Sequence, residues 1–279
     1  MSPSNEITPT QPGKFIKANN LNIYYEDHGS GVPVVLLHGG LGSSARMRHF
    51  MPALSENFRV ITPDLRGHGK TNNPSGQFSY RLLADDLAEF IERLEIHQPF
   101  ICGWSDGGQI ALELGMRYPN MAKGLVVGAA WYKFSENYRK FLHFLGTEAP
   151  GVVSYQQTEK AVPQFVEMLR RIHEPGPDYW KELFKQISVM WWTPLDYKTD
   201  DFARIIVPTL ILAGDRDALV PVEEAVEMYR FIPNAELAIA PHAEHSFPVT
   251  DPETFIALVL RFFLRHSRIV SQDESKEAD

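Results

Sequence analysis

The most informative part of the sequence is FICGWSDGGQIALELG, residues 100–115. It begins as an apolar β-strand pattern, is interrupted by glycines around Ser105, and continues with the apolar spacing of a helix. A strand, a sharp turn and a helix centred on Gly103-x-Ser105-x-Gly107 form the pattern called a nucleophile elbow. The serine in such a turn has a strained backbone, and larger neighbours than glycine would collide with the strand or the helix. The pattern predicts a reactive hydroxyl; a helix cap or an ordinary tight turn is the alternative interpretation.

The rest of the chain alternates apolar strands with amphipathic helices. A hairpin is predicted over residues 15–29, with Asn19-Asn20 at its turn. Further strands are predicted at 33–40, 58–64, 99–104, 124–130, 208–214 and 235–240, and helices at 80–94, 107–118, 222–232 and 251–266. Continuous apolar strands are typical of a parallel sheet that is buried on both faces. The predicted fold class is therefore α/β, with a doubly wound and mostly parallel sheet.

Residues 131–200 interrupt this alternation. They contain no convincing strand pattern, only amphipathic helical patches broken by proline and glycine. The interval holds 14 of the 32 aromatic residues of the chain, which is too many for a dangling loop. We predict a helical lid here, inserted after the sixth strand into a core of residues 14–130 and 201–268. Residues 1–13 and the charged tail 269–279 are expected to be flexible.

The overall composition excludes several classes of protein. The chain has 279 residues, 44% of them hydrophobic, and a formal charge of −8, so a soluble globular protein without a nucleic-acid partner is expected. Its single cysteine, Cys102, can form no intramolecular disulfide and is expected to be a buried, inert thiol. Neither a signal peptide nor a membrane-spanning run is recognisable, so we expect a cytoplasmic protein without a membrane partner.

A serine hydroxyl is a poor nucleophile on its own, so Ser105 needs a base, and the base needs an acid to orient it. The elbow predicts that the acid and then the histidine follow the serine in the chain. LILAGDRDALVP, residues 210–221, ends a predicted strand and offers Asp215 and Asp217. PHAEHSFPV, residues 241–249, follows the last predicted strand and offers His242 and His245.

With these motifs the chain resembles the α/β-hydrolase superfamily, from about residue 14 to residue 268. In that family the acid is usually the third residue after the glycine that ends the strand, which favours Asp217 over Asp215. The catalytic histidine of the family closes a Gly-x-Gly-His loop, which favours His245 over His242. Here the two glycines of that loop are replaced by His242 and Glu244, a departure that affects the local turn.

The resemblance also implies an oxyanion hole and a substrate pocket. The backbone N–H groups of Gly40 and Asp106 would form the hole, His38 would shape the loop before Gly40, and His68 would be structural. The pocket candidates are Gly39, Trp104, Asp106, Trp131, Trp191 and Trp192, although the tryptophans could equally be ordinary packing. The other histidines (His28, His49, His97, His143, His173 and His266) match no motif and have no metal-ligand spacing, so no metal or other cofactor is predicted.

Asp106, directly after the serine, has two interpretations. A carboxylate at the start of a helix is stabilised by the helix dipole by about 0.3–1 kcal/mol, which can be its whole purpose. Alternatively, it attracts a cationic substrate group. The sequence GWSDGG resembles the valacyclovir hydrolase, or biphenyl-hydrolase-like, branch of the family, in which an acid at this place contacts the α-amino group of amino-acid esters.

The predicted function is a cofactor-free serine hydrolase that cleaves carboxylic esters with small or aromatic groups, amino-acid esters included. Lactonase, thioesterase, aminopeptidase and carbon–carbon bond hydrolase activities use the same triad and stay open. Epoxide hydrolases and haloalkane dehalogenases have aspartate as the nucleophile, so Ser105 argues against both. A non-catalytic ligand receptor on the same fold is the alternative from a different class. The sequence does not indicate the oligomeric state.

Overall fold

The structure is a computed structural model that describes residues 12–267. Most of the predicted flexible N-terminus and the whole predicted tail 269–279 therefore lie outside the described residues. Eight strands form the main sheet: β1 (Lys14–Ala18), β2 (Leu21–His28), β3 (Pro33–Leu37), β4 (Arg59–Pro63), β5 (Phe100–Trp104), β6 (Gly124–Gly128), β9 (Thr209–Gly214) and β10 (Ala235–Ala240). Their order across the sheet is β1-β2-β4-β3-β5-β6-β9-β10.

The sheet is parallel from β4 to β10, and only β1 and β2 run antiparallel to their neighbours. This arrangement confirms the predicted α/β class with a mostly parallel sheet. The predicted hairpin is present as β1 and β2, and its turn residues Asn19 and Asn20 have φ angles of 45° and 62°. Asparagine tolerates this left-handed conformation, which two-residue hairpin turns of this kind require.

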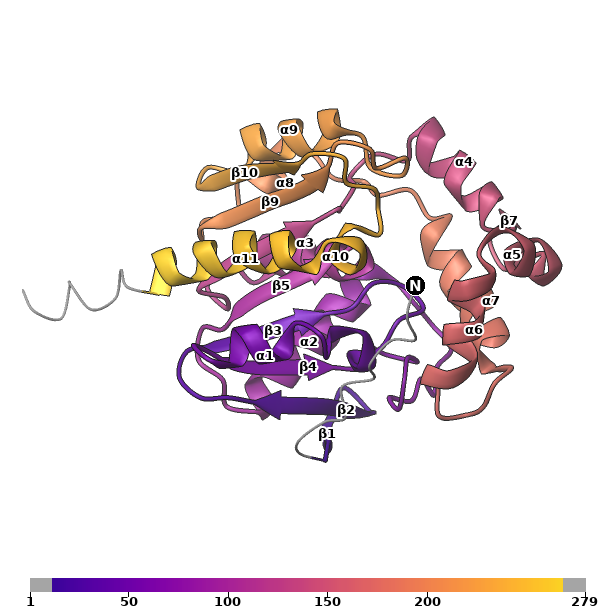
Figure 1. Ribbon diagram of the computed structural model, residues 1–279, viewed down its shortest axis with the longest axis horizontal. Coiled ribbons are helices and arrows are strands. Elements are labelled where there is room, and N and C mark those ends of the chain that lie inside the picture. Colours follow the sequence, from indigo (N-terminus) through magenta and orange to yellow (C-terminus); the bar gives the residue numbers. More distant parts are fainter. Residues whose placement is uncertain (1–11, 268–279) are drawn as a thin grey trace, which may run out of the picture.

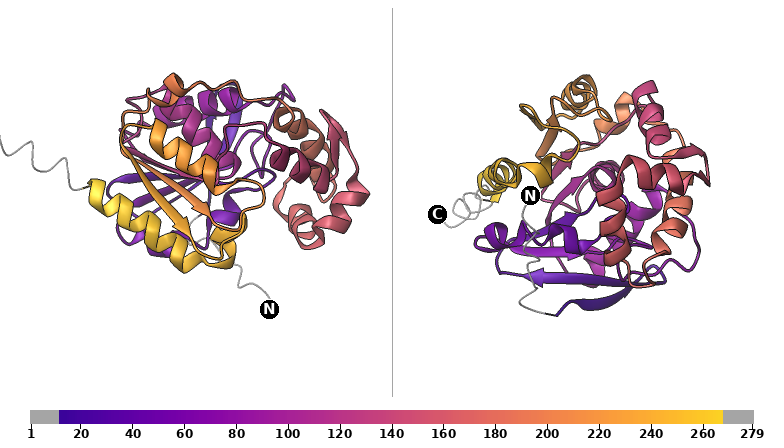
Figure 2. Two further views of the ribbon diagram at one scale, coloured as in Figure 1. Left: turned by 90° about the horizontal axis from the view of Figure 1, so that it is seen from above. Right: turned by 45° about the vertical axis from the view of Figure 1, so that its right-hand side comes forward.

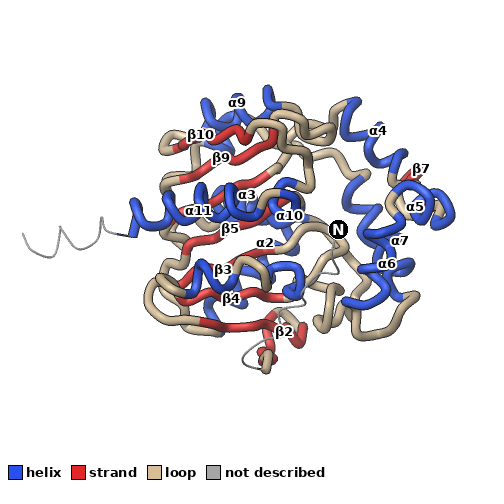
Figure 3. The backbone as a smooth tube through the Cα atoms, in the orientation of Figure 1, coloured by secondary structure: helices blue, strands red, loops and turns tan. Residues whose placement is uncertain are grey.

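Helices cover both faces of the sheet (Figures 1 and 3). One face packs against α2 (Tyr80–Arg93), α3 (Asp106–Arg117) and α9 (Val222–Phe231), and the other against α1 (Met51–Ser55) and α11 (Pro252–Ser267). Alternate residues of each central strand face opposite layers, so that in β3 Val34 and Leu36 belong to one core and Val35 and Leu37 to the other. Burial on both sides explains why these strands are continuously apolar.

Cys102 lies in β5, three residues before the elbow serine. Its side chain belongs to the core on the α1 and α11 side and is buried. Burial raises the pKa of the thiol to about 12, because a thiolate would be poorly solvated there.

The chain between β6 and β9 contains further, mostly short elements. They are α4 (Glu136–Phe144), β7 (Thr147–Ala149), β8 (Val152–Val153), α5 (Tyr155–Ala161), α6 (Pro163–Ile172), α7 (Tyr179–Trp191) and α8 (Thr199–Phe202). Helices α4 to α7 stand beside the end of the sheet toward which the parallel strands point (Figures 1 and 2). We call residues 131–200 the inserted segment.

The expectation that the inserted segment contains no strand is wrong. β7 and β8 pair antiparallel in a small hairpin with an irregular register. Strands of three and two residues are shorter than the run of alternating residues by which a strand is recognised in a sequence. Gly146 and Gly151, with φ angles of 91° and 73°, supply the backbone conformations that this hairpin needs.

Two short helices lie in loops at the carboxyl end of the sheet. They are the 3₁₀-helix η1 (Ser44–Met47) after β3 and α10 (Phe247–Thr250) after β10. Loops that follow parallel strands meet at one edge, which is where α/β proteins bind their ligands. Among the helices of residues 12–267, none is both long and apolar enough to cross a bilayer.

Candidate active site

Ser105 occupies the sharp turn between β5 and α3 that the sequence predicted. Its φ and ψ angles are 57° and −123°, a strained conformation for a residue with a side chain. The neighbouring glycines leave no room for a larger residue. A Cβ on Gly103 would lie 2.0 Å from the carbonyl oxygen of Gly107, and one on Gly107 would lie 2.4 Å from that of Leu37. The turn therefore depends on both glycines.

The structure brings together the three side chains that the sequence singled out. His245 Nε2 lies 2.9 Å from Ser105 Oγ, and His245 Nδ1 lies 2.8 Å from Asp217 Oδ2. The Asp217 carboxylate is fully buried, and its other oxygen accepts hydrogen bonds from two backbone N–H groups, those of Leu219 and Val220. These contacts fix the orientation of the carboxylate, which in turn fixes the imidazole.

The two competing residues lie elsewhere. Asp215 accepts a hydrogen bond from the backbone N–H of Ala243 at 3.3 Å, so it connects the loops after β9 and β10. His242 is exposed and has a φ angle of 54°. It thus adopts the left-handed conformation, which favours glycine, at a place where the family pattern has glycine.

The loop after β3 lies against the serine. A Cβ on Gly39 would be 3.3 Å from Ser105 Cβ. The carbonyl oxygen of Gly39 is held from behind, by His38 Nδ1 at 2.8 Å and by the N–H of Gly42 at 3.0 Å. Because the N–H of a trans peptide points away from its C=O, these bonds orient the N–H of Gly40 in the opposite direction. In the described part of the chain, neither this N–H nor that of Asp106 donates to another residue.

Three buried histidines hold this loop in place. His38 Nε2 accepts from the N–H of Leu65, and His68 Nε2 accepts from the N–H of Leu41, each at 3.1 Å. His173, from the end of α6, accepts from the N–H of Gly69 at 2.9 Å and donates to the carbonyl of Leu41 at 3.1 Å. Both backbone polar groups of Leu41, whose φ angle is 60°, are therefore bound to an imidazole.

Each of these imidazoles is neutral in this arrangement, because each has one nitrogen that accepts a backbone N–H. Burial lowers the pKa of His38 to about 3 and that of His173 to about 4, and it lowers the pKa of His68 well below its ordinary value. A proton on any of them would remove an acceptor and break a bond of the loop.

Asp106 is almost entirely buried, with 3% of its surface exposed. Its carboxylate accepts a hydrogen bond from the Tyr80 hydroxyl of α2 at 2.7 Å, and Trp191 Nε1 of α7 lies 2.9 and 3.1 Å from its two oxygens. Burial raises the pKa of Asp106 to about 6, although both donors stabilise the charged form. A Cβ on Gly40 would lie 2.4 Å from this carboxylate, so the group borders the predicted oxyanion hole.

The tryptophans proposed for the pocket differ in position. Trp104 donates to the backbone carbonyl of His245 at 2.9 Å and packs beneath it. Trp191 donates to Asp106, and a Cβ on Gly40 would lie 2.6 Å from its ring. Trp131 is buried against Tyr80 and Tyr138, one layer away from the serine. Trp192 donates to Thr147 and packs against Phe134, so its contacts lie within the inserted segment.

Sequence reasoning missed Tyr80 and the role of His173. Each lies in or beside a surface helix without a recognisable motif, and each reaches the site through the packing of distant segments. No local signal in the sequence identifies them.

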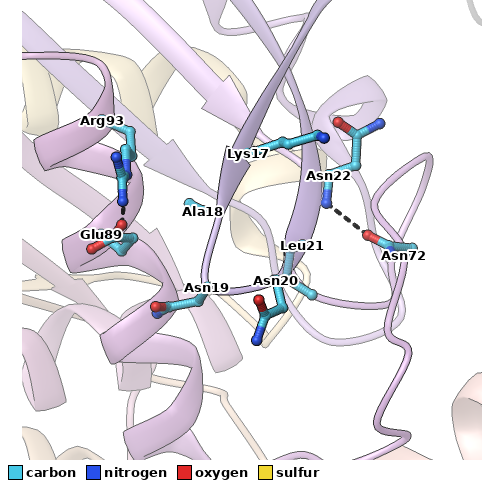
Figure 4. Close-up of a pocket in the computed structure, with 9 residues that line it drawn as sticks. All are labelled: Lys17, Ala18, Asn19, Asn20, Leu21, Asn22, Asn72, Glu89 and Arg93. Carbon is cyan, nitrogen blue, oxygen red and sulfur yellow. Dashed lines mark hydrogen bonds and ion pairs between the residues drawn. The ribbon is translucent and has the colours of Figure 1, made fainter.

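The groove of about 780 Å³ shown in Figure 4 is not part of this site. It lies along the β1–β2 hairpin and beside α2, and polar side chains surround it, among them Asn19, Asn22, Asn72 and Arg93. None of the residues of the candidate active site lines it. Two of its asparagines bond to backbone groups, since Asn19 donates to the carbonyl of Asp85 and Asn72 accepts from the N–H of Asn22.

A family model described as alpha/beta hydrolase fold matches residues 32–252. A protein of Synechocystis sp. named putative non-heme chloroperoxidase is 28% identical, over 87% of this chain and 95% of its own length. Two solved structures are also similar. A meta-cleavage product hydrolase from Pseudomonas fluorescens IP01 has a TM-score of 0.76 and 25% identity, covering 91% of this chain and 98% of that one. A thermophilic esterase from Thermogutta terrifontis has a TM-score of 0.73 and 26% identity, covering 92% and 99%.

Proposed function

Because the chain belongs to the α/β hydrolase family, as its motifs predicted and as the match over residues 32–252 shows, we propose that it is a serine hydrolase that cleaves carboxylic esters through an acyl-enzyme. The hydrolase class follows from the family; the bond cleaved and the residues that act on it are the proposal. One observation carries it: the contacts of 2.9 and 2.8 Å that join Ser105, His245 and Asp217 in a line. The resemblance to a solved esterase agrees with it.

In the first half-reaction Ser105 Oγ attacks the ester carbonyl while His245 Nε2 takes the hydroxyl proton. Asp217 holds the imidazole in the tautomer that leaves Nε2 free to accept, and it stabilises the imidazolium that forms. The N–H groups of Gly40 and Asp106 donate to the developing oxyanion, which costs little reorganisation because the loop is already held from behind. The carbon–oxygen bond to the leaving alcohol then breaks, and His245 returns the proton to that alcohol.

In the second half-reaction water replaces the alcohol. His245 Nε2 takes a proton from the water as its oxygen attacks the acyl carbonyl, and the same two N–H groups stabilise the second oxyanion. The acyl–Oγ bond breaks, Ser105 recovers its proton from His245, and a carboxylic acid leaves. The products are one acid and one alcohol for each water consumed, and every step uses side chains of this chain only.

The inserted segment would act as the lid over this reaction. Phe141 of α4 lies with its ring 6.1 Å from that of His245, and Trp191 of α7 reaches Asp106. A lid that excludes water strengthens the electrostatic interactions beneath it. We leave amino-acid esters out of the proposal, because the Asp106 carboxylate is buried and its oxygens already accept from Trp191 and Tyr80.

A fluorophosphonate reporter tests the proposal, since it reacts only with an activated serine. We expect rapid labelling of the natural protein and none of the Ser105→Ala variant, together with hydrolysis of simple methyl or p-nitrophenyl esters. A protein that labels at another residue, or that does not label and hydrolyses no ester, contradicts the proposal.

Cleavage of a carbon–carbon bond is the second candidate. It is favoured by the similarity to the solved meta-cleavage product hydrolase, which covers 91% of this chain. A direct comparison of hydrolysis rates separates the two candidates. Carbon–carbon bond cleavage requires a 2-hydroxy-6-oxo-2,4-dienoic acid, the class of substrate named for one relative, to react at least as fast as the best ester. The ester proposal requires the best ester to react faster.

A further inference from the structure

Arg46, in η1, is a cation at the edge of the site that the proposed reaction does not use. Its side chain passes over the loop after β3, since a Cβ on Gly42 would lie 3.3 Å from Arg46 Cδ. Gly42 is bonded to Gly39, which touches Ser105. The base of the Arg46 side chain therefore lies on the loop that shapes the predicted oxyanion hole.

The guanidinium lies against the inserted segment. Nη1 is 3.6 Å from the sulfur of Met168, and the guanidinium carbon is 5.8 Å from the centre of the Phe165 ring, both on α6. His49, three residues further along the chain, brings its Nε2 to within 3.4 Å of the carbonyl of Pro248, in the loop that carries His245. Arg46 thus stands where the loops after β3 and β10 meet the inserted segment.

This guanidinium has no acidic partner among residues 12–267. Its neighbour Arg48 shows the usual arrangement, with an ion pair of 2.6 Å to the buried Glu26. Around Arg46 the groups in contact are a thioether and an aromatic ring, which leave most of its five N–H donors unused. Burial also lowers the pKa of Arg46, as expected for a cation that is partly desolvated without an anion.

From this placement we infer that Arg46 binds a carboxylate carried by the substrate itself, so that the preferred substrates are half-esters of dicarboxylic acids or related anionic esters. This inference rests on the proposed ester hydrolysis for the position of the reacting bond. A guanidinium matches a carboxylate with two parallel hydrogen bonds, and in a partly buried site such a pair is considerably stronger than on an open surface. The substrate would supply the anion that the chain does not.

The test compares monomethyl with dimethyl esters of dicarboxylic acids, from succinic to suberic acid, which differ only in one free carboxylate. For the best chain length we expect kcat/KM of the natural protein to be higher for the monoester, and Arg46→Met to lower it by about 50-fold, mostly through KM. The same variant should change the rate on the diester less than about threefold. Arg46→Lys, which keeps the charge, should recover part of the preference, and Arg261→Met, which removes an exposed charge on α11, should change neither rate.

A binding measurement separates this inference from the proposed reaction. Calorimetric titration of the Ser105→Ala variant with the same two esters needs no catalysis. Tighter binding of the monoester that is lost when Arg46→Met is added supports the inference, even if no ester is hydrolysed and the proposed function fails. Equal binding and equal kcat/KM for the two esters overturn it, even if both are hydrolysed. Circular dichroism and the melting temperature show whether Arg46→Met is folded; if it is not, Arg46→Lys and the monoester preference of the natural protein decide.

Discussion

Histidines serve opposite purposes on the two sides of one short loop. In front of the loop after β3, His245 lies between a hydroxyl and a carboxylate, and about a quarter of its side chain is exposed. Behind the loop, His38, His68 and His173 are buried and bond only to backbone groups. The first imidazole contacts two side chains of the proposed triad, and the others have backbone partners that require them to stay neutral.

The difference shows what decides whether a histidine transfers protons. A base must gain and lose a proton within its site, so it needs an acid behind it and access to the reacting atoms. An imidazole that accepts from one N–H and donates to one C=O acts instead as a rigid connector between two stretches of backbone. In this protein the connectors orient the N–H of Gly40, whereas His245 is the proposed base for the neighbouring hydroxyl.

The largest effect is expected in front of the loop. Ser105→Ala and His245→Gln should each lower kcat on the best ester by about 10⁴–10⁶-fold, because either change removes the proposed nucleophile or its proposed base. Asp217→Asn should cost about 10⁴-fold through the wrong tautomer of His245. The double variant Ser105→Ala/His245→Gln should be little worse than Ser105→Ala alone, since the three residues are proposed to act as one unit. Losses that add up on a logarithmic scale would show that they act independently.

A smaller effect is expected behind the loop. His173→Ala removes the donor to the carbonyl of Leu41 and the acceptor for the N–H of Gly69, so the loop is held less firmly. We expect kcat to fall by about 10–100-fold with little change in KM, by analogy with the loss of one oxyanion-hole donor. His173→Gln, which can still donate and accept, should recover part of the rate. A fall in kcat as large as that of His245→Gln would contradict the view that His173 only holds the loop in place.

The sequence was sufficient for the elements that are specified locally. The elbow, Asp217 and His245 follow strand ends, and parallel strands necessarily bring their carboxyl ends to one edge, so motif and topology together predicted the contacts that the structure contains. The turn at Asn19-Asn20 is equally local. The role of His173 could not be predicted, and Trp191 was predicted as a pocket candidate but not as the donor to Asp106. Both residues come from the inserted segment, whose docking depends on tertiary packing rather than on any pattern near the residue. The β7–β8 hairpin was not predicted, because its strands are too short to show an alternating pattern.

The smallest effect concerns acid stability. The pKa of His173 is about 4 in the folded protein and 6.5 in an ordinary peptide, so between these values the unfolded chain binds a proton that the folded chain does not. This contribution to stability is fully present above pH 6.5 and is lost as the pH falls toward 4, at up to about 1.4 kcal/mol per pH unit. Urea unfolding at several pH values should therefore show a shallower acid loss in His173→Gln than in the natural protein. Parallel curves for the two proteins would mean that His173 is protonated in the folded state.

The burial of Cys102 in the core of β5 makes the protein well suited to spectroscopy. Cys102 is the only cysteine of the chain, and its burial shields it from reagents. A maleimide dye would therefore react only with a cysteine introduced at Val189, which is 46% exposed on α7. A change in dye emission during turnover would then report a movement of the inserted helices, and no native thiol has to be removed first.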